Sequence, residues 1–337
     1  MRYPKFLQPG GKIGIIAPSF GACTEPYRSR LESAVGVFSE AGYETVIGAN
    51  CFESSGAGKS SSPEACGAEI NDFFLNGRSD VIISCGGGET MCEDLPFVDF
   101  EGISKSEPRW FMGFSDNTNL TFTLPVLCDT AAIYGPCAPA FGRLPLHSSL
   151  EDALQLLEGK KLEVKNYEFW EKEGCDSEAP LSSYNLTEPF GMKVFSPGGE
   201  KNVSLSGRLI GGCLDCLQVL CGTEFDRVHE FSQKYRADGI IWFIESCDLT
   251  AFGVRRALWQ LDNAGWFENA AGFLIGRPLR PEEDSFSAVS SVLEKYNKPI
   301  IFDLDIGHLP PMMPLISGAL AQIQTAENSF SIKFSLE

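Results

Sequence analysis

Short apolar runs alternate with helix-like segments through the first 135 residues, and this alternation constrains the fold more than any other feature. The runs predict strands at 12–18, 43–47, 80–84, 110–114 and 131–134. Between them, residues 27–41 and 64–75 carry apolar residues at helical spacing, and Gly42 fits a helix C-cap. Short buried strands separated by helices indicate a parallel sheet that is covered on both faces.

A second block with both kinds of element begins near residue 206. The patterns predict helices at 210–220 and 250–264 and strands at 239–244, 272–275 and 299–304. Residues 319–336 alternate apolar and polar side chains, as a half-exposed antiparallel strand pair does. We therefore expect an α/β protein with an N-terminal parallel-sheet domain and a strand-rich α+β C-terminal domain.

The stretch between the two blocks has a different character. It holds one expected helix at 150–157, after which charged, Ser, Gly and Pro residues dominate. We expect three parts: an N-terminal α/β nucleophile domain (1–145), a connecting segment that could cover the substrate (146–205), and a C-terminal domain (206–337). The active site is expected where the two domains meet.

Charge and composition exclude several classes of protein. The formal net charge is −18, which disfavours nucleic acid and anionic membranes as partners. No apolar run approaches the roughly 18–20 residues of a membrane span, and the N-terminus does not resemble a secretion signal. We therefore expect a cytoplasmic protein. Its 12 cysteines lack the paired spacing of a zinc site and are predicted to be buried, reduced thiols.

The chain has only three histidines, so few residues could act as an imidazole base. His147 and His229 lie in polar surroundings that are typical of surface positions. His308 directly follows the expected strand 299–304 and precedes two prolines. A strand end followed by a rigid loop is where α/β folds place active sites, although a packed turn histidine fits the same pattern.

Ser115 is the candidate nucleophile. It lies in Gly113-Phe114-Ser115-Asp116-Asn117, between the expected strand 110–114 and a helix-like segment. The order strand, turn, serine, helix is that of a nucleophile elbow, in which the next backbone N–H, here that of Asp116, faces the oxyanion. The match to G-x-S-x-G is incomplete, and a helix N-cap serine is the stronger alternative from this motif alone.

Two further segments could complete such a site. Gly86-Gly87-Gly88 follows an expected strand, so its amides could bind an oxyanion or a substrate carboxylate, or could simply form a tight turn. Glu245 ends the fully apolar run 240–244. A carboxylate there could orient a histidine, as the acid of a triad does, or could pair with Arg255 or Arg256.

Together these pieces resemble the serine LD-carboxypeptidase family, which includes muramoyl-tetrapeptide carboxypeptidases and the microcin C self-immunity peptidase. The resemblance covers nearly the full length, and the order of the segments is more specific than any one of them. In family order the segments are KIGIIAPS at 12–19, SCGGG at 84–88, GFSD at 113–116, GRLIGG at 207–212, Ile244-Glu245 and Gly307-His308.

The resemblance implies a triad with Ser115 as nucleophile, Glu245 as orienting acid and His308 as general base. It also implies a homodimer and neither a metal nor a cofactor. The backbone amides of Gly88 and Asp116 are the expected oxyanion donors. The chain departs from the family at Gly88, where an aromatic residue is usual, so the identity of the second donor stays open. It departs also at three further positions, Cys213, Ser246 and Leu309.

The resemblance implies a small peptide or a peptidyl-nucleotide as substrate. One subgroup of the family releases D-alanine from a murein tetrapeptide, and we favour that activity slightly. The other cleaves aminoacyl-nucleotide conjugates, for which Trp170 could stack on the base, although a lone tryptophan is more often a packing residue. Gly87 is a further candidate for substrate binding. An inactive binder on the same fold and a cysteine-dependent amidotransferase are the remaining alternatives, and the intact triad and Ser115 disfavour them.

Overall fold

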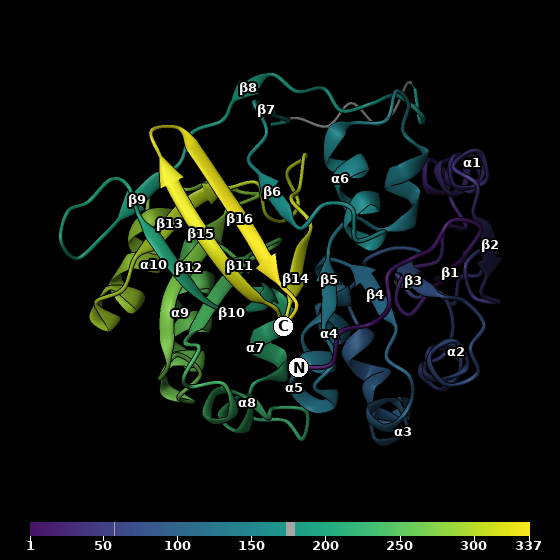
Figure 1. The fold of residues 1–337 in the computed structure, drawn as a ribbon, viewed down its shortest axis with the longest axis horizontal. Coiled ribbons are helices and arrows are strands. Elements are labelled where there is room, and N and C mark those ends of the chain that lie inside the picture. The colour runs from purple at the N-terminus through teal and green to yellow at the C-terminus, as the bar shows by residue number, and fades with distance from the viewer. Residues whose placement is uncertain (57, 173–178) are drawn as a thin grey trace.

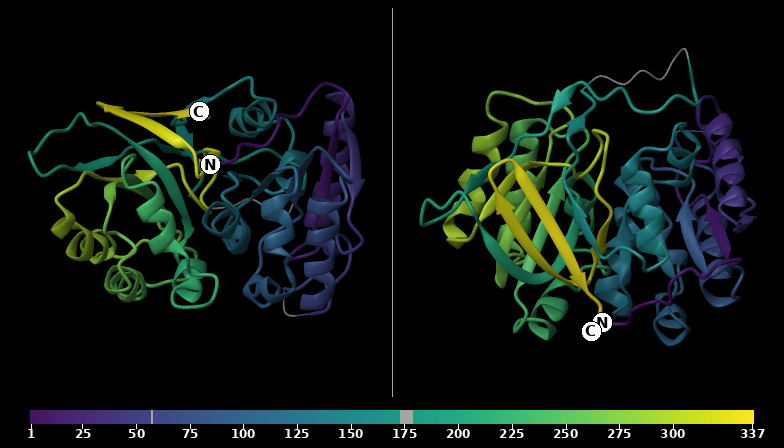
Figure 2. Two further views of the ribbon diagram at one scale, coloured as in Figure 1. Left: turned by 60° about the horizontal axis from the view of Figure 1, so that its bottom comes forward. Right: turned by 45° about the horizontal axis from the view of Figure 1, so that its top comes forward.

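A computed structural model describes residues 1–56, 58–172 and 179–337. The described residues form two large β-sheets with helices packed against both and one separate pair of short strands, and Figure 1 shows the N-terminal and C-terminal parts side by side. The two further views in Figure 2 show the same arrangement, with both chain ends close together. The observed architecture is the α/β fold expected from the sequence, with a parallel N-terminal sheet and a strand-rich C-terminal part.

The first sheet has six strands. In spatial order they are β14 (Leu315–Ser317), β5 (Ala132–Tyr134), β4 (Trp110–Gly113), β3 (Val81–Ser84), β1 (Lys12–Ile16) and β2 (Glu44–Ile47). The five strands from the N-terminal part are parallel, as predicted, and β14 from the distant C-terminal part adds an antiparallel edge. Through this edge strand, the C-terminal part of the chain pairs with the first sheet.

Helices cover both faces of the first sheet because its strands are apolar on both sides. One face packs against α1 (Tyr27–Glu40) and α6 (Ser148–Leu157). The opposite face packs against α2 (Pro63–Leu75), α3 (Phe100–Lys105), α4 (Thr118–Thr121) and α5 (Thr123–Cys128). Gly42 follows α1 with φ +88°, which matches the predicted C-terminal glycine.

The second sheet has eight strands. In spatial order they are β6 (Glu163–Lys165), β16 (Ser329–Ser335), β15 (Leu320–Ala326), β10 (Ser204–Cys213), β11 (Ile240–Glu245), β12 (Ala270–Gly276), β13 (Ile300–Leu304) and β9 (Lys193–Phe195). The central strands β10 to β13 are parallel, and the outer pairs are antiparallel. The predicted antiparallel pair at the end of the chain is β15 with β16.

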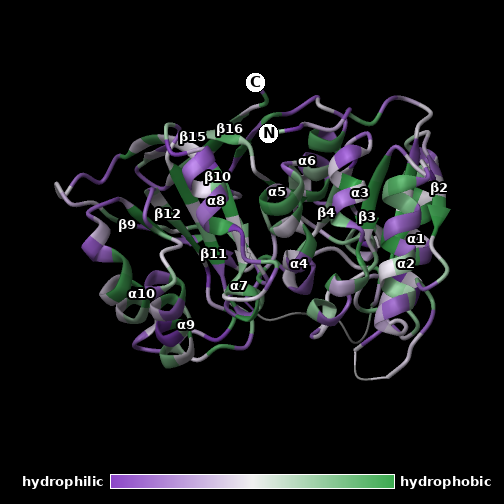
Figure 3. Cartoon of the chain, turned by 90° about the horizontal axis from the view of Figure 1, so that it is seen from below, coloured by the Kyte–Doolittle hydropathy of each residue, from purple (hydrophilic) through white to green (hydrophobic). Residues whose placement is uncertain are grey.

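One face of the second sheet packs against four helices, which are α7 (Leu214–Leu220), α8 (Val228–Lys234), α9 (Ala251–Asn263) and α10 (Ser285–Leu293). The other face of β10 to β13 joins a buried cluster that also contains apolar residues of β1, β3 and β4. Figure 3 shows β3 and β10 to β12 as mainly hydrophobic, whereas α1, α2 and α9 carry a mixture of hydrophilic and hydrophobic residues. One apolar core therefore continues from the first sheet to the second.

The prediction of a helix over 210–220 is wrong for its first four residues. Residues 210–213 belong to strand β10, and α7 begins only at Leu214. Gly211 lies so close to β11 that a Cβ there would be 1.8 Å from the carbonyl oxygen of Phe243. Glycine lowers helix stability and permits such close packing of strands, so tertiary pairing decides the conformation.

Residues 146–205 do more than connect the two blocks. They supply α6, the edge strands β6 and β9 of the second sheet, and a separate pair of short strands, β7 (Phe169–Trp170) with β8 (Glu188–Pro189). The alternation of β6 and β9 is too short to be recognised in the sequence, and pairing with neighbours defines them. The division of the chain at 145 and 205 stays a prediction.

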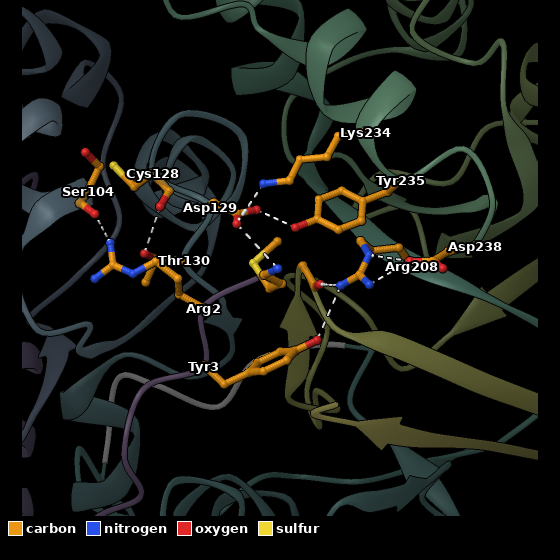
Figure 4. A network of polar contacts seen from close by, with 12 residues as sticks. Arg2, Tyr3, Ser104, Cys128, Asp129, Thr130, Arg208, Lys234, Tyr235 and Asp238 are labelled. Carbon is orange, nitrogen blue, oxygen red and sulfur yellow. Dashed lines mark hydrogen bonds and ion pairs between the residues drawn. The ribbon is translucent and has the colours of Figure 1, made fainter.

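A polar network joins the N-terminal segment to the second sheet (Figure 4). The guanidinium of Arg208, on β10, is buried and donates to Asp238 Oδ2 at 2.6 and 2.9 Å and to the carbonyl oxygen of Gly318 at 2.7 Å. The guanidinium carbon, Cζ, lies 3.9 Å from the ring centroid of Tyr235. The guanidinium nitrogen Nη1 also donates to the hydroxyl of Tyr3 at 3.3 Å. These contacts satisfy a charge that burial would otherwise destabilise.

Replacing Arg208 by leucine is expected to reduce the free energy of unfolding by about 3 kcal/mol, because it leaves Asp238 without its partner. This is the low end of the range for buried pairs, since Asp238 retains 30% of its side-chain exposure. Arg227→Leu is the control, because Arg227 and Glu230 are both more than half exposed, and it should change stability by less than about 0.5 kcal/mol. Urea unfolding measures both, and equal effects would contradict the prediction.

Candidate active site

Ser115 lies at the sharp turn between β4 and α4. It begins a 3₁₀ turn, Ser115–Asn117, and has φ +62°, which is a strained conformation for a residue other than glycine. Such strain costs on the order of 1–3 kcal/mol and is found mainly at functional sites. Gly113 allows the turn to close, because a Cβ there would lie 2.8 Å from Asn117 Cγ. The geometry agrees with the elbow expected from the sequence.

The structure brings together the three residues that were predicted to form a triad. His308 Nε2 lies 2.8 Å from Ser115 Oγ, and His308 Nδ1 lies 2.8 Å from Glu245 Oε2. A carboxylate only accepts hydrogen bonds, so Nδ1 carries the proton and Nε2 is free to accept the Ser115 hydroxyl proton. Glu245 ends β11 with 2% of its surface exposed, and it contacts His308 rather than Arg255 or Arg256.

Gly307 makes the contact between Glu245 and His308 sterically feasible. It has φ +102°, and a Cβ at this position would lie 2.5 Å from Glu245 Oε2. Asp305 holds the start of the same loop, because its buried carboxylate pairs with Arg277 at 2.5 Å and accepts from the backbone N–H of Tyr167 at 2.8 Å. The loop that carries His308 is therefore attached to both β12 and the segment 146–205.

The environment of His308 shifts its pKa in two opposing directions. Burial lowers the pKa of His308. The negative charge of Glu245 raises it, and so does hydrogen bonding with the side chain of Cys247. The balance places the pKa of His308 well above 6.5. A base with a raised pKa is protonated over a wider range of pH, so a reaction that needs neutral His308 should be favoured at neutral to alkaline pH.

Tyr134 belongs to the site, although its place in the sequence predicted only that it is part of a strand. Its hydroxyl contacts Glu245 Oε1 and lies 3.2 Å from the backbone nitrogen of Ser115. The side chain is fully buried at the end of β5, beside β4. The available signal was a tyrosine at the carboxyl end of an apolar strand, which does not by itself indicate a polar contact.

The glycine loop after β3 lies beside the serine. A Cβ at Gly87 would be 3.3 Å from Ser115 Oγ, whereas one at Gly88 would be 2.0 Å from Ser19 Oγ. Gly87 is thus the glycine next to the nucleophile, and Gly88 lines the cavities around it. The assignment of Gly88 and Asp116 as oxyanion donors stays a prediction, as does the role of Gly87 in binding substrate.

Asp116 fixes the elbow to neighbouring segments. Its carboxylate is buried and accepts from Ser19 Oγ at 2.5 Å and from the backbone N–H of Met91 at 2.9 Å. Burial raises the pKa of this carboxyl group, and the two donors oppose that shift. The side chain is therefore occupied with holding the turn, which leaves only the backbone of Asp116 for the predicted oxyanion contact.

Two cavities meet at Ser115. The larger has a volume of about 620 Å³ and is lined by the glycine loop, His308, aromatic residues, three cationic residues (Arg30, Arg143 and Lys172) and two acidic ones (Glu89 and Glu171). The smaller has a volume of about 90 Å³ and is lined by acidic residues and cysteines, among them Glu89, Asp215 and Asp248. Among the described residues no group of three or more His, Cys, Asp or Glu side chains is arranged to hold a metal ion.

The contacts of Trp170 are with residues other than the triad. Its indole N–H donates to the carbonyl oxygen of Pro189 at 3.2 Å, and the guanidinium of Arg277 lies 5.0 Å from its ring. Trp170 is absent from the described lining of both cavities, whereas the adjacent Glu171 and Lys172 line the larger one. The stacking of Trp170 on a nucleobase stays a prediction, and the observed contacts are those of a packing residue.

The other two histidines lie elsewhere in the fold. His147 caps α6 by accepting from the backbone N–H of Ser149 at 3.1 Å, and His229 is exposed on α8. The cysteines of the described chain are free thiols. No described helix is long and apolar enough to cross a membrane.

Comparison with known proteins places both halves of the chain in one family. The LD-carboxypeptidase N-terminal domain matches residues 13–135, and the LD-carboxypeptidase C-terminal domain matches residues 206–323. A "probable murein peptide carboxypeptidase" of Bacillus subtilis (strain 168) is 26% identical, over 98% of this chain and 94% of that protein. The microcin C7 self-immunity protein MccF of Escherichia coli is 23% identical, over 78% and 76%.

Solved structures share the fold over almost the full length. An MccF-like protein from Bacillus anthracis (strain Ames) aligns with a TM-score of 0.84 and 22% identity, covering 99% of this chain and all of that one. MccF in complex with glutamyl sulfamoyl guanosine aligns with a TM-score of 0.80 and 21% identity, covering 98% of both chains. At this level of identity the structures establish the fold and leave the substrate of this chain open.

Proposed function

The chain belongs to the LD-carboxypeptidase family, since matches to both family domains span more than half of it, and we propose that Ser115, His308 and Glu245 make it an active serine peptidase. The observation that carries this proposal is the hydrogen-bonded series Ser115 Oγ, His308 Nε2, His308 Nδ1, Glu245 Oε2, with both contacts at 2.8 Å. A nucleophile, a base and an orienting acid in this geometry suit acyl transfer.

The reaction would proceed in two halves. His308 Nε2 takes the proton of Ser115 as Oγ attacks the scissile carbonyl carbon, and backbone N–H groups of the elbow and the glycine loop stabilise the oxyanion. The imidazolium returns that proton to the leaving amine as the C–N bond breaks, which yields an ester on Ser115. Water, deprotonated by His308, then hydrolyses the ester and restores the serine.

Glu245 supports both halves through its charge. It keeps the proton of the imidazole on Nδ1 and stabilises the imidazolium that forms when Nε2 accepts a proton. The same charge raises the pKa of His308 above its usual value, against the effect of burial. The acid therefore contributes orientation and electrostatic stabilisation and does not itself exchange protons.

For the substrate, we favour a murein tetrapeptide from which an L,D-carboxypeptidase releases D-alanine. The Bacillus subtilis relative, similar over nearly the whole length of both proteins, supports this choice. The charges around Ser115 also fit a substrate with a terminal carboxylate, provided that the carboxylate faces the larger cavity. Lys172, Arg30 and Arg143 line that cavity together with two acids, Glu89 and Glu171. The smaller cavity is lined by Glu89, Asp215 and Asp248 and by no Lys or Arg among the described residues, so it would repel an anion more strongly.

The larger cavity also has room for a second candidate substrate, an aminoacyl- or peptidyl-nucleotide conjugate, and its aromatic lining suits the base of such a compound. A volume of about 620 Å³ exceeds what a single alanine fills, and Phe20, Tyr27 and Tyr184 offer aromatic surface to a ring. The related MccF structure contains glutamyl sulfamoyl guanosine. A bulky tetrapeptide would occupy the same volume, so the cavity alone does not separate the two substrates.

Parallel assays with two substrates test the proposal. Purified protein is incubated with a murein tetrapeptide that ends in D-alanine and, separately, with glutamyl sulfamoyl adenosine, and the products are identified by mass spectrometry. Release of D-alanine alone, abolished in Ser115→Ala, is the expected result. Cleavage of the conjugate alone would replace the favoured substrate by the alternative and make Trp170 the next residue to mutate.

If neither compound is cleaved, the binding of the intact compounds separates two alternatives. Binding without cleavage would indicate an inactive binder on this fold, and no binding would indicate an enzyme with another substrate. Calorimetric titration of the unmodified protein with each compound measures that binding. We also propose the homodimer that the resemblance implies. Size-exclusion chromatography with light scattering would give twice the mass of the 36.8 kDa chain if it is correct.

A further inference from the structure

The hydroxyl of Tyr134 is the one side-chain group among the described residues that contacts both the acid and the backbone of the candidate nucleophile. It contacts Glu245 Oε1 and lies 3.2 Å from the backbone nitrogen of Ser115. Tyr134 ends β5 of the first sheet, where it pairs with Gly113, and Ser115 lies in the turn just after β4 of that sheet, whereas Glu245 ends a strand of the second. One hydroxyl therefore bridges the two sheets at the site.

The direction of each hydrogen bond follows from the chemistry of the groups. A carboxylate only accepts, so the phenol O–H donates to Glu245 Oε1, and an oxygen lone pair then accepts the N–H of Ser115. Glu245 Oε2 is left for the Nδ1–H of His308 at 2.8 Å. Each carboxylate oxygen thus has a different donor, and the two donors share one negative charge.

We infer that Tyr134 is a positioning residue, which sets how strongly Glu245 pairs with His308 and holds the backbone of Ser115 in the strained elbow. The first effect works through charge, because each hydrogen bond to Glu245 disperses part of the charge that attracts the imidazolium. The second works through geometry, because Ser115 at φ +62° keeps its N–H directed at the tyrosine oxygen. Nothing in the sequence pattern predicted either effect.

Several described ionisable groups interact with His308 or with its partners. Besides Glu245, they include Cys247 on the following loop and Glu89 across the cavity, and Cys213 lies near Glu245 and Tyr134. Burial and the charge of Glu245 raise the pKa of Tyr134 well above 10, so the phenol keeps its proton at physiological pH. A change at Tyr134 is therefore a change in hydrogen bonding and leaves the net charge of the site unaltered.

Tyr134→Phe should raise the pKa of His308. Without the phenol O–H, Glu245 keeps more of its charge for the imidazolium, which stabilises the protonated form. Glu245→Gln should do the opposite, because it removes the charge that raises the pKa. Tyr235→Phe is the matched control, since its hydroxyl also contacts a carboxylate, that of Asp129, in the network at the far end of β10.

Nuclear magnetic resonance of protein labelled with ¹⁵N-histidine measures these pKa values directly. The chain has only three histidines, so the ring signals of His308 can be assigned by substitution, and His147 and His229 serve as internal references. We expect an upward shift of about 0.5 or more in Tyr134→Phe, a downward shift in Glu245→Gln and no shift in Tyr235→Phe. This measurement needs no substrate, so it stands whether or not the proposed function is correct.

Rates provide a second readout, which rests on the proposed function. Tyr134→Phe leaves the N–H of Ser115 without this acceptor and loosens the elbow, so kcat should fall about tenfold while KM changes less than about twofold. In the plot of kcat/KM against pH, the acid limb of Tyr134→Phe should move to higher pH together with the pKa of His308. A purely structural role would lower stability without moving the limb.

An unchanged pKa of His308 in folded Tyr134→Phe would overturn the inference. If that variant does not fold, the same pKa is measured in protein of unchanged sequence that contains 3-fluorotyrosine in place of tyrosine. Fluorination makes each phenol a stronger hydrogen-bond donor and keeps the hydroxyl group in place. The stronger donation should lower the pKa of His308 and leave His229 unchanged. A pKa of His308 that does not fall in this protein would likewise overturn the inference.

Discussion

Replacing Ser115 by alanine is expected to lower kcat/KM by about 10⁴-fold or more, on whichever substrate the enzyme accepts. The substitution removes Oγ, which is the atom that forms the ester, and the 2.8 Å contact with His308 disappears with it. Removal of the nucleophile from a triad leaves only the catalysis that the oxyanion donors and substrate binding provide. The rate is measured by release of product under conditions of excess substrate.

The protein should remain folded after this substitution, so a loss of activity can be attributed to the missing hydroxyl and not to unfolding. Ser115→Ala retains the Cβ at φ +62°, so its free energy of unfolding should change by less than about 1 kcal/mol. Ser115→Gly should be more stable than either by about 1 kcal/mol, because glycine adopts positive φ without strain. Ser287→Ala, at an exposed serine on α10, is the activity control. Full activity in Ser115→Ala would refute the proposed triad.

Replacing His308 by alanine is expected to lower kcat/KM by about 10³-fold or more, because no other described group lies within hydrogen-bonding distance of Ser115 Oγ as a base. The dependence on pH provides a sharper test. His308 must be neutral to accept a proton, and its pKa lies well above 6.5, so activity of the unmodified enzyme should fall about tenfold per pH unit below that pKa.

The residual activity of His308→Ala should lack this acid limb, since the titrating group is gone. Glu245→Gln should reduce the rate less than His308→Ala, because it keeps the base, and it should move the limb to lower pH by removing the charge that raises the pKa. His229→Ala, on the exposed face of α8, should leave both rate and profile unchanged. A limb that persists in His308→Ala would assign the titration to another group.

Local patterns predicted most of the strands and helices of the fold. The runs predicted as strands at 12–18, 80–84 and 239–244 form the buried strands β1, β3 and β11, with bounds that differ by up to two residues. Local patterns failed where pairing decided the conformation. Residues 210–213 look helical by their spacing but lie in β10, and the edge strands β6 and β9 are too short to show any period.

The candidate site could be predicted in part for a different reason. With three histidines and one strand-turn-serine motif, few combinations were available, and Ser115 and His308 lie within hydrogen-bonding distance in the structure. Tyr134 escaped prediction because its partners are 19 and 111 residues away in the sequence. Nothing local distinguishes it from a tyrosine that only packs.

The amino-acid sequence by itself determined the alternation of strands and helices, the position of the elbow and the short list of residues able to act as nucleophile, base and acid. Those features depend on side-chain chemistry and on spacing along the chain. Only the tertiary structure decided which residues meet. The carboxyl ends of β4, β5, β11 and β13 converge because two sheets share one apolar core, and this convergence brings Tyr134 to Glu245 and forms two unlike cavities around Ser115. Contacts of this kind depend on distances across the fold, which a linear pattern does not contain.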